Sequence, residues 1–191
     1  MTNTGAIPVW DPLVRLFHWG LVAGVMVALV TGDEVLAIHV LAGHMVLGLV
    51  LFRLLWGLFG IGHARFGDFV RGPAQVFGHL AAIRHGHPPR SLGHNPAGGA
   101  MIVALLVVLA LTGLSGLAGL GAKEALGPLA WLANIRNAGL AEALEEIHEL
   151  FGTLVWPLVG LHLVGVVIGM WQHRENLVWS MVTGRKRECA P

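Results

Sequence analysis

The sequence predicts an all-α integral membrane protein, a bundle of four membrane-spanning helices, and its composition is the first reason. Of its 191 residues, 55% are hydrophobic and only 12% are charged, and the mean hydropathy is +0.70. A soluble domain of this length carries about twice that charged fraction. Four stretches are long and apolar enough to cross a hydrocarbon core about 30 Å thick. We expect these spans, at about 13–32, 35–59, 98–120 and 147–171, to form one membrane domain over residues 1–191.

The first span follows a short polar lead. Pro12 suits the first helical turn and Trp10 suits the membrane interface. The span has no small-x-small cleavage pattern, so we expect it to be retained rather than removed as a signal peptide. Asp33 and Glu34 form a very short turn into the second span. The first two spans should therefore be antiparallel neighbours.

Two longer connections separate the remaining spans. The connection at 60–97 contains a segment of mixed polarity, 69–83, which predicts an amphipathic helix at the membrane surface. Asn95 and Pro96 suit the N-cap and first residue of the third span. The connection at 121–146 is long enough for a short helix and ends in acidic residues.

Basic residues concentrate on one side of the predicted membrane. Cytoplasmic loops of membrane proteins are enriched in Lys and Arg, so this asymmetry places both termini in the cytoplasm. The last three basic residues form a juxtamembrane cluster. The basic residues on this side are Arg15, Arg65, Arg71, Arg84, Arg90, Arg174, Arg185, Lys186 and Arg187, against Lys123 and Arg136 on the other side.

Eleven histidines divide into two groups. Those in polar loops or at span ends are expected to be solvated: His63, His79, His85, His87, His94 and His173. Those inside or at the mouths of spans are His18, His39, His44, His148 and His162. One buried histidine in a membrane often only hydrogen-bonds across helices. Five in one chain indicate a function, because ionisable groups at that depth are costly.

The spacing of His148 and His162 indicates two cofactors at two depths. Fourteen residues advance a helix by about 21 Å and turn it almost four times, so both imidazoles leave the same face. Sorted by depth, His18 is level with His162 (the inner pair) and His39 with His148 (the outer pair). Each pair can clamp one haem iron from two sides. Such iron has no open position, which favours electron transfer.

The single cysteine limits how a haem could be held. Cys189 alone cannot form an intrachain disulfide, a Cys-x-x-Cys-His attachment or an iron–sulfur cluster within this chain. Any haem is therefore non-covalent, of the b type. Small residues on the second and fourth spans allow close approach of helices or of a flat macrocycle. They are Gly43, Gly48, Gly152, Gly160 and Gly165.

Three further side chains complete the candidate site. His44 is the alternative to His39, but five residues rotate a helix by about 140°, so both cannot face one haem. His39 fits the depth of the outer pair better. Arg53, fourteen residues beyond His39, and Arg15, nearly one turn before His18, can each meet a haem propionate. The other interpretation is that both arginines snorkel to lipid headgroups.

Motifs over nearly the whole chain resemble the bacterial cytochrome b561 and nickel–iron hydrogenase b-type cytochrome family. They are VWDPLVRLFHW at 9–19, HVLAG at 39–43 with RLLWG at 53–57, GHNPAGG at 93–99, HELFG at 148–152 with LVGLHLVGV at 158–166, and HRENLVWSMVTGRKR at 173–187. The stretch ARFGDFVRGPAQV and the tail RENL…TGRKR are most similar to the subgroup that accompanies c-type cytochromes.

The resemblance implies a four-helix bundle in a bacterial inner membrane that binds two b haems. The family's ligand positions fall on His18, His39, His148 and His162. Its HxxxG…R pattern falls on His39, Gly43 and Arg53, which favours His39 as the outer ligand. Where the family commonly has a tyrosine after that glycine, this chain has His44. Members pass electrons between a membrane quinone pool and a partner such as hydrogenase or cytochrome c.

We therefore expect a dihaem electron-transfer subunit, rather than a self-contained enzyme, that works in lipid without nucleic acid. Quinone would bind near His94 and Asn95, unless GHNPAGG only caps the third span. The acidic segment from Glu142 to Glu149 would dock a basic c-type cytochrome or hydrogenase-like subunit, unless it is simply solvated. Two other functions are a histidine-lined metal or proton transporter, which needs a continuous polar path, and a structural anchor for a redox enzyme.

Overall fold

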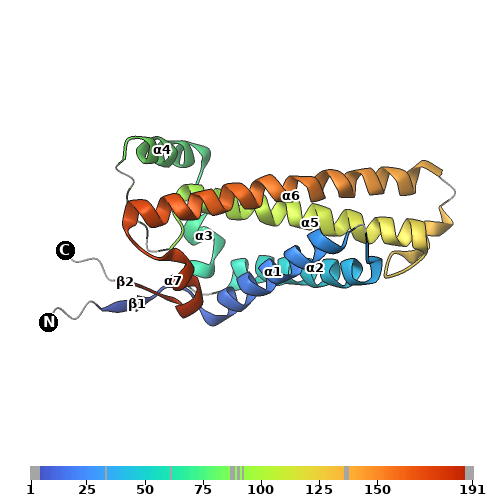
Figure 1. The fold of residues 1–191 in the computed structure, drawn as a ribbon, viewed down its shortest axis with the longest axis horizontal. Coiled ribbons are helices and arrows are strands. Elements are labelled where there is room, and N and C mark those ends of the chain that lie inside the picture. Colours follow the sequence, from blue (N-terminus) through green and yellow to red (C-terminus); the bar gives the residue numbers. More distant parts are fainter. Residues whose placement is uncertain are drawn as a thin grey trace. The chain divides into compact units, whose positions relative to one another are not determined.

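Four long helices form the frame of the protein. The computed structural model describes residues 5–32, 34–60, 62–86, 89, 91, 93–135 and 138–187. Each long helix contains all or nearly all of one predicted span and is long and apolar enough to cross a membrane, which confirms the predicted fold class (Figure 1). Asp33, His87, Arg90, Arg136 and Cys189 lie outside the described residues. The long helices are α1 (Pro12–Thr31), α2 (Leu36–Phe59), α5 (Pro96–Glu124) and α6 (Ala138–His173).

Short elements occupy the connections. Helix α4 covers most of the segment predicted to be an amphipathic helix, but its apolar residues are not gathered on one face. Pro73 at its first turn separates it from the single turn of α3. The acidic segment before the fourth span is part of α6 itself, so this helix begins well before the predicted span. The short elements are β1 (Ala6–Pro8), η1 (Gly62–Ala64), α3 (Phe66–Phe69), α4 (Pro73–Arg84), η2 (Ala130–Asn134), α7 (Leu177–Thr183) and β2 (Arg185–Arg187).

Side-chain caps fix three helix starts. Asp11 Oδ1 accepts a hydrogen bond from the Val14 amide at 2.9 Å at the start of α1. Asn95 Oδ1 accepts one from Gly98 at 2.7 Å, as predicted for the start of α5. Asn176 Oδ1 accepts one from the Trp179 amide at 2.8 Å at the start of α7. These oxygens satisfy amides that have no partner inside the helix.

The chain divides into two compact units. Unit 1 comprises Met1–Trp19, Arg53–Val103 and Val159–Pro191, and unit 2 comprises Gly20–Phe52 and Ala104–Leu158. Each long helix contributes residues to both units. The inner pair of histidines belongs to unit 1, and the outer pair belongs to unit 2.

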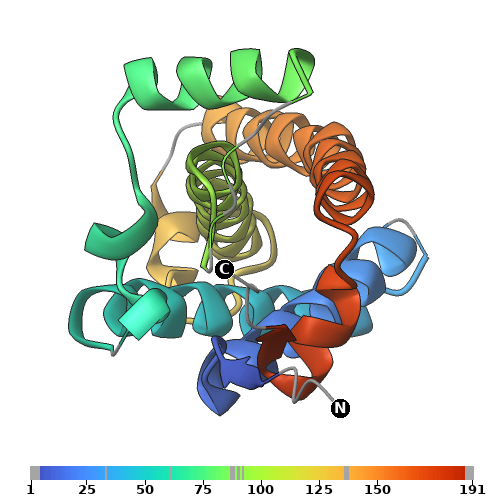
Figure 2. The same cartoon turned by 90° about the vertical axis from the view of Figure 1, so that its left-hand side faces the viewer.

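Unit 1 contains a two-stranded antiparallel sheet that joins the two ends of the chain. The register pairs Ala6 with Arg187, Ile7 with Lys186, and Pro8 with Arg185. The amides of Val9 and Trp10 continue the contact by donating to the Gly184 carbonyl at 2.8 and 3.1 Å. Gly184 ends α7 with φ +80°, which favours glycine. The sheet and α7 lie together in Figure 2.

Lys186 in this sheet is buried, although the sequence assigned it to a juxtamembrane basic cluster. The residue is 6% exposed, and its Nζ lies 4.0 Å from Glu175 Oε2 and 5.7 Å from the centre of the Trp10 ring. A buried ammonium needs such a counter-charge. Strand pairing with β1 draws Lys186 inward, while Arg185 stays exposed.

Unit 2 is held by small residues and aliphatic packing. A Cβ at Gly24 would approach Val46 and Met45, and one at Gly113 would approach Leu47, so close helix contact depends on these glycines. Val50 and Val155 are buried in the same unit. Many other aliphatic side chains on the long helices are exposed, as expected of surfaces that face lipid.

Candidate functional site

The outer pair of histidines comes together in unit 2. The rings of His39 on α2 and His148 on α6 have centres 5.8 Å apart, and their planes are inclined at 89°. Both side chains are half-buried. Depth alone predicted this pairing, and the structure places the two rings side by side.

Each ring of the outer pair is oriented by a backbone carbonyl. His39 Nδ1 lies 2.9 Å from the Ala28 carbonyl oxygen on α1, and His148 Nδ1 lies 2.9 Å from the Thr112 carbonyl oxygen on α5. A carbonyl only accepts, so Nδ1 carries the proton in each ring and donates it. A neutral imidazole then keeps its lone pair on Nε2. This tautomer binds metals through Nε2.

Gly116 allows α5 to approach His148. It lies one turn beyond Thr112, and a Cβ built on it would fall 2.7 Å from Cε1 and 2.8 Å from Nδ1 of His148. Real Cβ atoms do not make such short contacts, so a side chain there would displace the ring. Sequence reasoning missed both residues. Thr112 acts through its backbone, and Gly116 lies on a span without candidate ligands.

Two glycines keep the faces beside the outer pair free of side chains. Gly43 and Gly152 each follow a histidine of this pair by four residues, so each lies one turn along on the same helix face. Both are half-buried, yet a Cβ at either position would meet nothing within 4 Å. The two helices therefore offer flat faces next to His39 and His148.

His44 lies apart from this arrangement. Its side chain is exposed, and its Nδ1 lies 2.7 Å from the Val40 carbonyl oxygen on its own helix. The ring contacts described for His148 are made by His39. The geometry therefore groups His39, and not His44, with His148.

The inner pair lies in unit 1. His18 on α1 and His162 on α6 are half-buried, and the imidazole of His162 is close enough to act electrostatically on that of His18. His18 Nδ1 is buried without a hydrogen-bond partner in the described part of the chain. The ring of Trp19 stands edge-on to His18, with centres 5.1 Å apart. Unlike the two outer rings, the ring of His18 is therefore not oriented by a backbone carbonyl of the described residues.

Arg53 is enclosed by aromatic rings in the same unit. It is 3% exposed, and its guanidinium carbon lies 4.9 Å from the centre of Phe66 and 5.6 Å from that of Phe69, both on α3. Its Nη1 is buried without a partner among the described residues. The Asp11 carboxylate is close enough to act electrostatically on Arg53. Arg53 does not reach headgroups by snorkelling, because α3 covers it, an arrangement that the sequence did not reveal.

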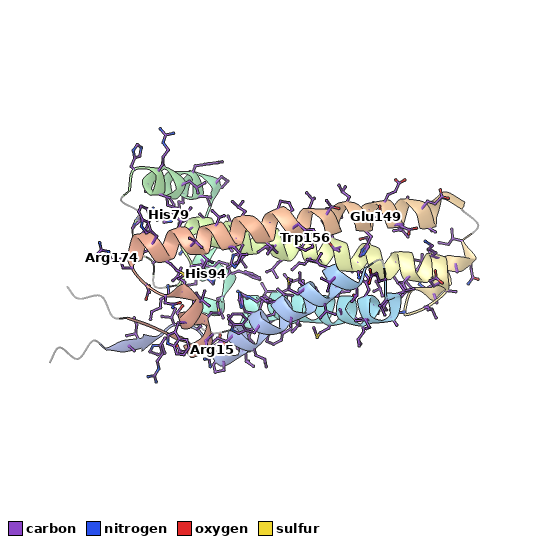
Figure 3. All side chains as sticks on the ribbon, in the orientation of Figure 1. Arg15, His79, His94, Glu149, Trp156 and Arg174 are labelled. Carbon is purple, nitrogen blue, oxygen red and sulfur yellow. The ribbon has the colours of Figure 1, made fainter. Side chains whose placement is uncertain are left out.

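Arg15 uses part of its guanidinium for a hydrogen bond within the fold. Its Nη1 donates to the Val182 carbonyl at the end of α7 at 2.6 Å, and Nε is buried without a partner in the described residues (Figure 3). A side chain that bonds α7 serves the fold. The buried Nε leaves Arg15 one further donor for a bound anion.

His94 and Asn95 occupy different environments. The His94 ring packs between Trp10 and Phe69, with ring centres 4.5 and 4.9 Å away. Asn95 Oδ1 caps α5. Asn95 thus fills the capping role that the sequence offered as one of two alternatives, while His94 lies in an aromatic cluster in unit 1.

His79 is buried, which corrects the prediction of a solvated loop histidine. It is 4% exposed on α4, and neither ring nitrogen has a hydrogen-bond partner in the described residues. Burial, and secondarily the neighbouring His173, lower the pKa of His79 below its usual 6.5. Figure 3 shows it on the side of α4 turned towards the last turns of α6, where Gln172 Nε2 donates to the Ile83 carbonyl.

The remaining charged groups form no closed metal site. Among the residues that the structure describes, no three His, Cys, Asp or Glu side chains gather as metal ligands would. The acidic residues at the start of α6 line an open surface, where Lys123 pairs with Glu145 at 2.9 Å. These residues are Glu142, Glu145, Glu146 and Glu149. The histidines of the site thus occur as pairs.

Comparison with known proteins agrees with this architecture. The sequence model of a family described as prokaryotic cytochrome b561 matches residues 9–184, a range that includes all four long helices and both histidine pairs. No curated protein and no solved structure matches the chain. The chain belongs to the prokaryotic cytochrome b561 family, and it is a helical b-type membrane cytochrome, of a class that binds haem b and transfers electrons.

Proposed function

We propose that this cytochrome carries electrons across a bacterial inner membrane through two b haems. His39 and His148 ligate one iron, and His18 and His162 ligate the other. The observation that carries the proposal is the approach of the outer rings to 5.8 Å between centres, each with Nδ1 already bonded to a carbonyl. One helix, α6, supplies a ligand to each iron.

The residues of the outer pair fit a haem. The rings of His39 and His148 lie 5.8 Å apart between centres, and they would hold one iron through their Nε2 atoms. Gly43 and Gly152 leave room for a flat macrocycle beside the two rings, because no side chain projects from these positions. Both Nε2 atoms have the lone pair that a metal requires.

The residues of the inner pair fit a second haem. His18 and His162 supply two imidazoles from different helices of one unit. The unpartnered Nη1 of Arg53 and Nε of Arg15 supply cationic donors suited to propionates. A buried guanidinium without a full set of partners is costly in a membrane protein, and a bound carboxylate would offset that cost.

The chain's own groups then control the chemistry. Bound haem supplies an iron that alternates between the ferric and ferrous states. Two imidazoles at each iron leave no position for oxygen or substrate, which restricts the site to electron transfer. The carbonyls of Ala28 and Thr112 keep the outer rings from rotating. Apolar helix faces limit the entry of water.

Orientation and partners follow from charge. The basic loops place both termini in the cytoplasm, so the inner pair lies towards that side. Quinone binds on the inner side near His94. Of the two residues at this place, Asn95 is the less suited to contact quinone, because its Oδ1 is engaged as the N-cap of α5. A c-type cytochrome or hydrogenase-like subunit meets the outer side, where the acidic start of α6 attracts a basic partner.

The test is the haem content and visible spectrum of the purified, dithionite-reduced protein. Two haems b per chain and a sharp b-type α band are expected. Either His39→Ala or His162→Ala should remove one haem and leave the other. The matched control, His44→Ala, should retain both. A colourless protein with bound zinc contradicts the proposal, and loss of the outer haem in His44→Ala contradicts the ligand assignment.

A further inference from the structure

The two histidine pairs differ in what their Nδ1 atoms meet. In the outer pair, both Nδ1–H groups donate to backbone carbonyls at 2.9 Å. In the inner pair, His18 Nδ1 is buried and has no hydrogen-bond partner within the described residues. The difference lies outside the atoms that would bind iron, so it concerns how strongly each ring donates electrons.

Resting on the proposed dihaem function, we infer that the carbonyls of Ala28 and Thr112 hold the midpoint potential of the outer haem below that of the inner haem. Gly116 is the positioning residue that lets one of these hydrogen bonds form. Electrons then run downhill from the outer side to the inner side.

The hydrogen bonds act through ligand basicity. A carbonyl that accepts from Nδ1–H draws the proton away from the ring and increases electron density at Nε2. A more basic ligand stabilises ferric iron more than ferrous iron, which lowers the reduction potential. His39 and His148 both gain this effect, whereas His18 lacks it.

Charge acts in the same direction. Arg53 is a buried cation in the unit that holds the inner pair, and a positive charge in a low-dielectric setting favours the gain of an electron. The negative charge of Asp11 opposes this effect of Arg53. Its carboxylate is, however, shared with two other donors, since it accepts hydrogen bonds from Val14 N and Trp56 Nε1. Among the described residues of unit 2, the charged side chains are mainly glutamates.

Gly116 makes the outer arrangement testable. A Cβ at this position would lie 2.8 Å from His148 Nδ1, so Gly116→Ala should push the ring away from the Thr112 carbonyl. Gly119, three residues later on α5, provides a matched control. A Cβ there would meet only Leu144 Cβ, at an ordinary 3.9 Å.

The first measurement is a potentiometric titration of the full-length dihaem protein. Two one-electron steps are expected, and His39→Ala and His18→Ala assign them by leaving the inner and the outer haem, respectively. The midpoint potential of the outer haem should lie at least about 59 mV below that of the inner haem, which corresponds to a tenfold equilibrium constant for moving one electron from the outer to the inner haem. Equal potentials, or a lower inner potential, overturn the inference. A protein with fewer than two haems contradicts the proposed function instead.

The second measurement uses the glycine variants. Gly116→Ala should move only the outer step to higher potential, while Gly119→Ala should leave both steps unchanged. An unmoved outer step in haem-replete Gly116→Ala refutes the positioning role. If that variant loses the outer haem, redox-difference infrared spectra of wild-type protein with isotope-labelled histidine decide the point. The histidine vibrations that report a strongly hydrogen-bonded Nδ1–H must then change in the low-potential step. If these vibrations do not appear in that step, the inference is overturned.

Discussion

Lys186 and Glu175 form an ion pair in the interior of unit 1, with 4.0 Å between Nζ and Oε2. Both side chains are almost wholly buried, so neither charge is stabilised by water. The pair connects the last strand to the polypeptide between α6 and α7. It therefore fastens the segment that also pairs with the N-terminal strand.

Removal of one partner should destabilise unit 1. Lys186→Met removes the ammonium that faces the buried Glu175 carboxylate, and breaking a buried ion pair in this way typically costs about 3–5 kcal/mol. The double variant Lys186→Met/Glu175→Leu should recover most of that loss. Thermal loss of the haem absorption band measures the effect, with the exposed Arg185→Met as control. If the double variant were no more stable than Lys186→Met, the pair would not be the cause.

Filling the flat face beside the outer pair should exclude the outer haem. Gly43→Leu adds a side chain one turn from His39, at a half-buried position that no other side chain enters. We expect a protein with one haem whose inner spectrum is intact. Gly48→Leu is the matched control, because Gly48 is exposed on the same helix and also meets nothing within 4 Å. Two haems in Gly43→Leu would show that the macrocycle lies elsewhere.

The packing of α4 should weaken as the pH falls. Burial, together with His173, lowers the pKa of His79 below 6.5, so the packed helix takes up a proton less readily than the released helix. Packing is therefore unaffected well above pH 6.5 and loses stability below it. Hydrogen exchange of the α4 amides, followed from about pH 7.5 to pH 5, measures this change. His79→Leu should flatten the pH profile, whereas substitution of the exposed His85 should not.

Substitutions at the adjacent residues His94 and Asn95 should have different effects, one on quinone binding and the other on the stability of α5. Asn95→Ala removes the cap of α5 and should cost about 1 kcal/mol of stability. It should leave the Michaelis constant for a quinone analogue nearly unchanged. His94→Ala should raise that constant, because quinone is proposed to bind near this ring. The opposite result, a quinone effect confined to Asn95→Ala, would transfer the quinone contact to the amide.

The sequence was sufficient for features that repeat along a helix. Hydropathy identifies α1, α2, α5 and α6, because a span needs a long apolar run. Helical periodicity and depth pair His39 with His148, since both rules act over many residues. Helix α6 begins at Ala138, before the predicted span, because charged residues continue a helix outside the membrane, where hydropathy gives no signal.

Features that depend on tertiary contact escaped prediction. The roles of Thr112 and Gly116 beside His148 could not be predicted from their residue types, because one acts through its backbone carbonyl and the other through the lack of a side chain. Strands of three residues have too little alternation to be recognised, so the burial of Lys186 was missed with them. His79 was predicted to be solvated because it lies in a polar connection between spans, yet in the structure the side chain is buried where α4 meets the end of α6.

The pairing of β1 with β2 sets an order for biogenesis. A ribosome releases Ala6 early, but its strand partner Arg187 only after every span has been made. Unit 2 needs no residue beyond Leu158, whereas unit 1 needs the strand that follows α7. The polypeptide that would hold the outer cofactor is thus made before that of the inner one, which must await the synthesis of β2. Haem insertion should follow the same sequence, with the outer centre matured first.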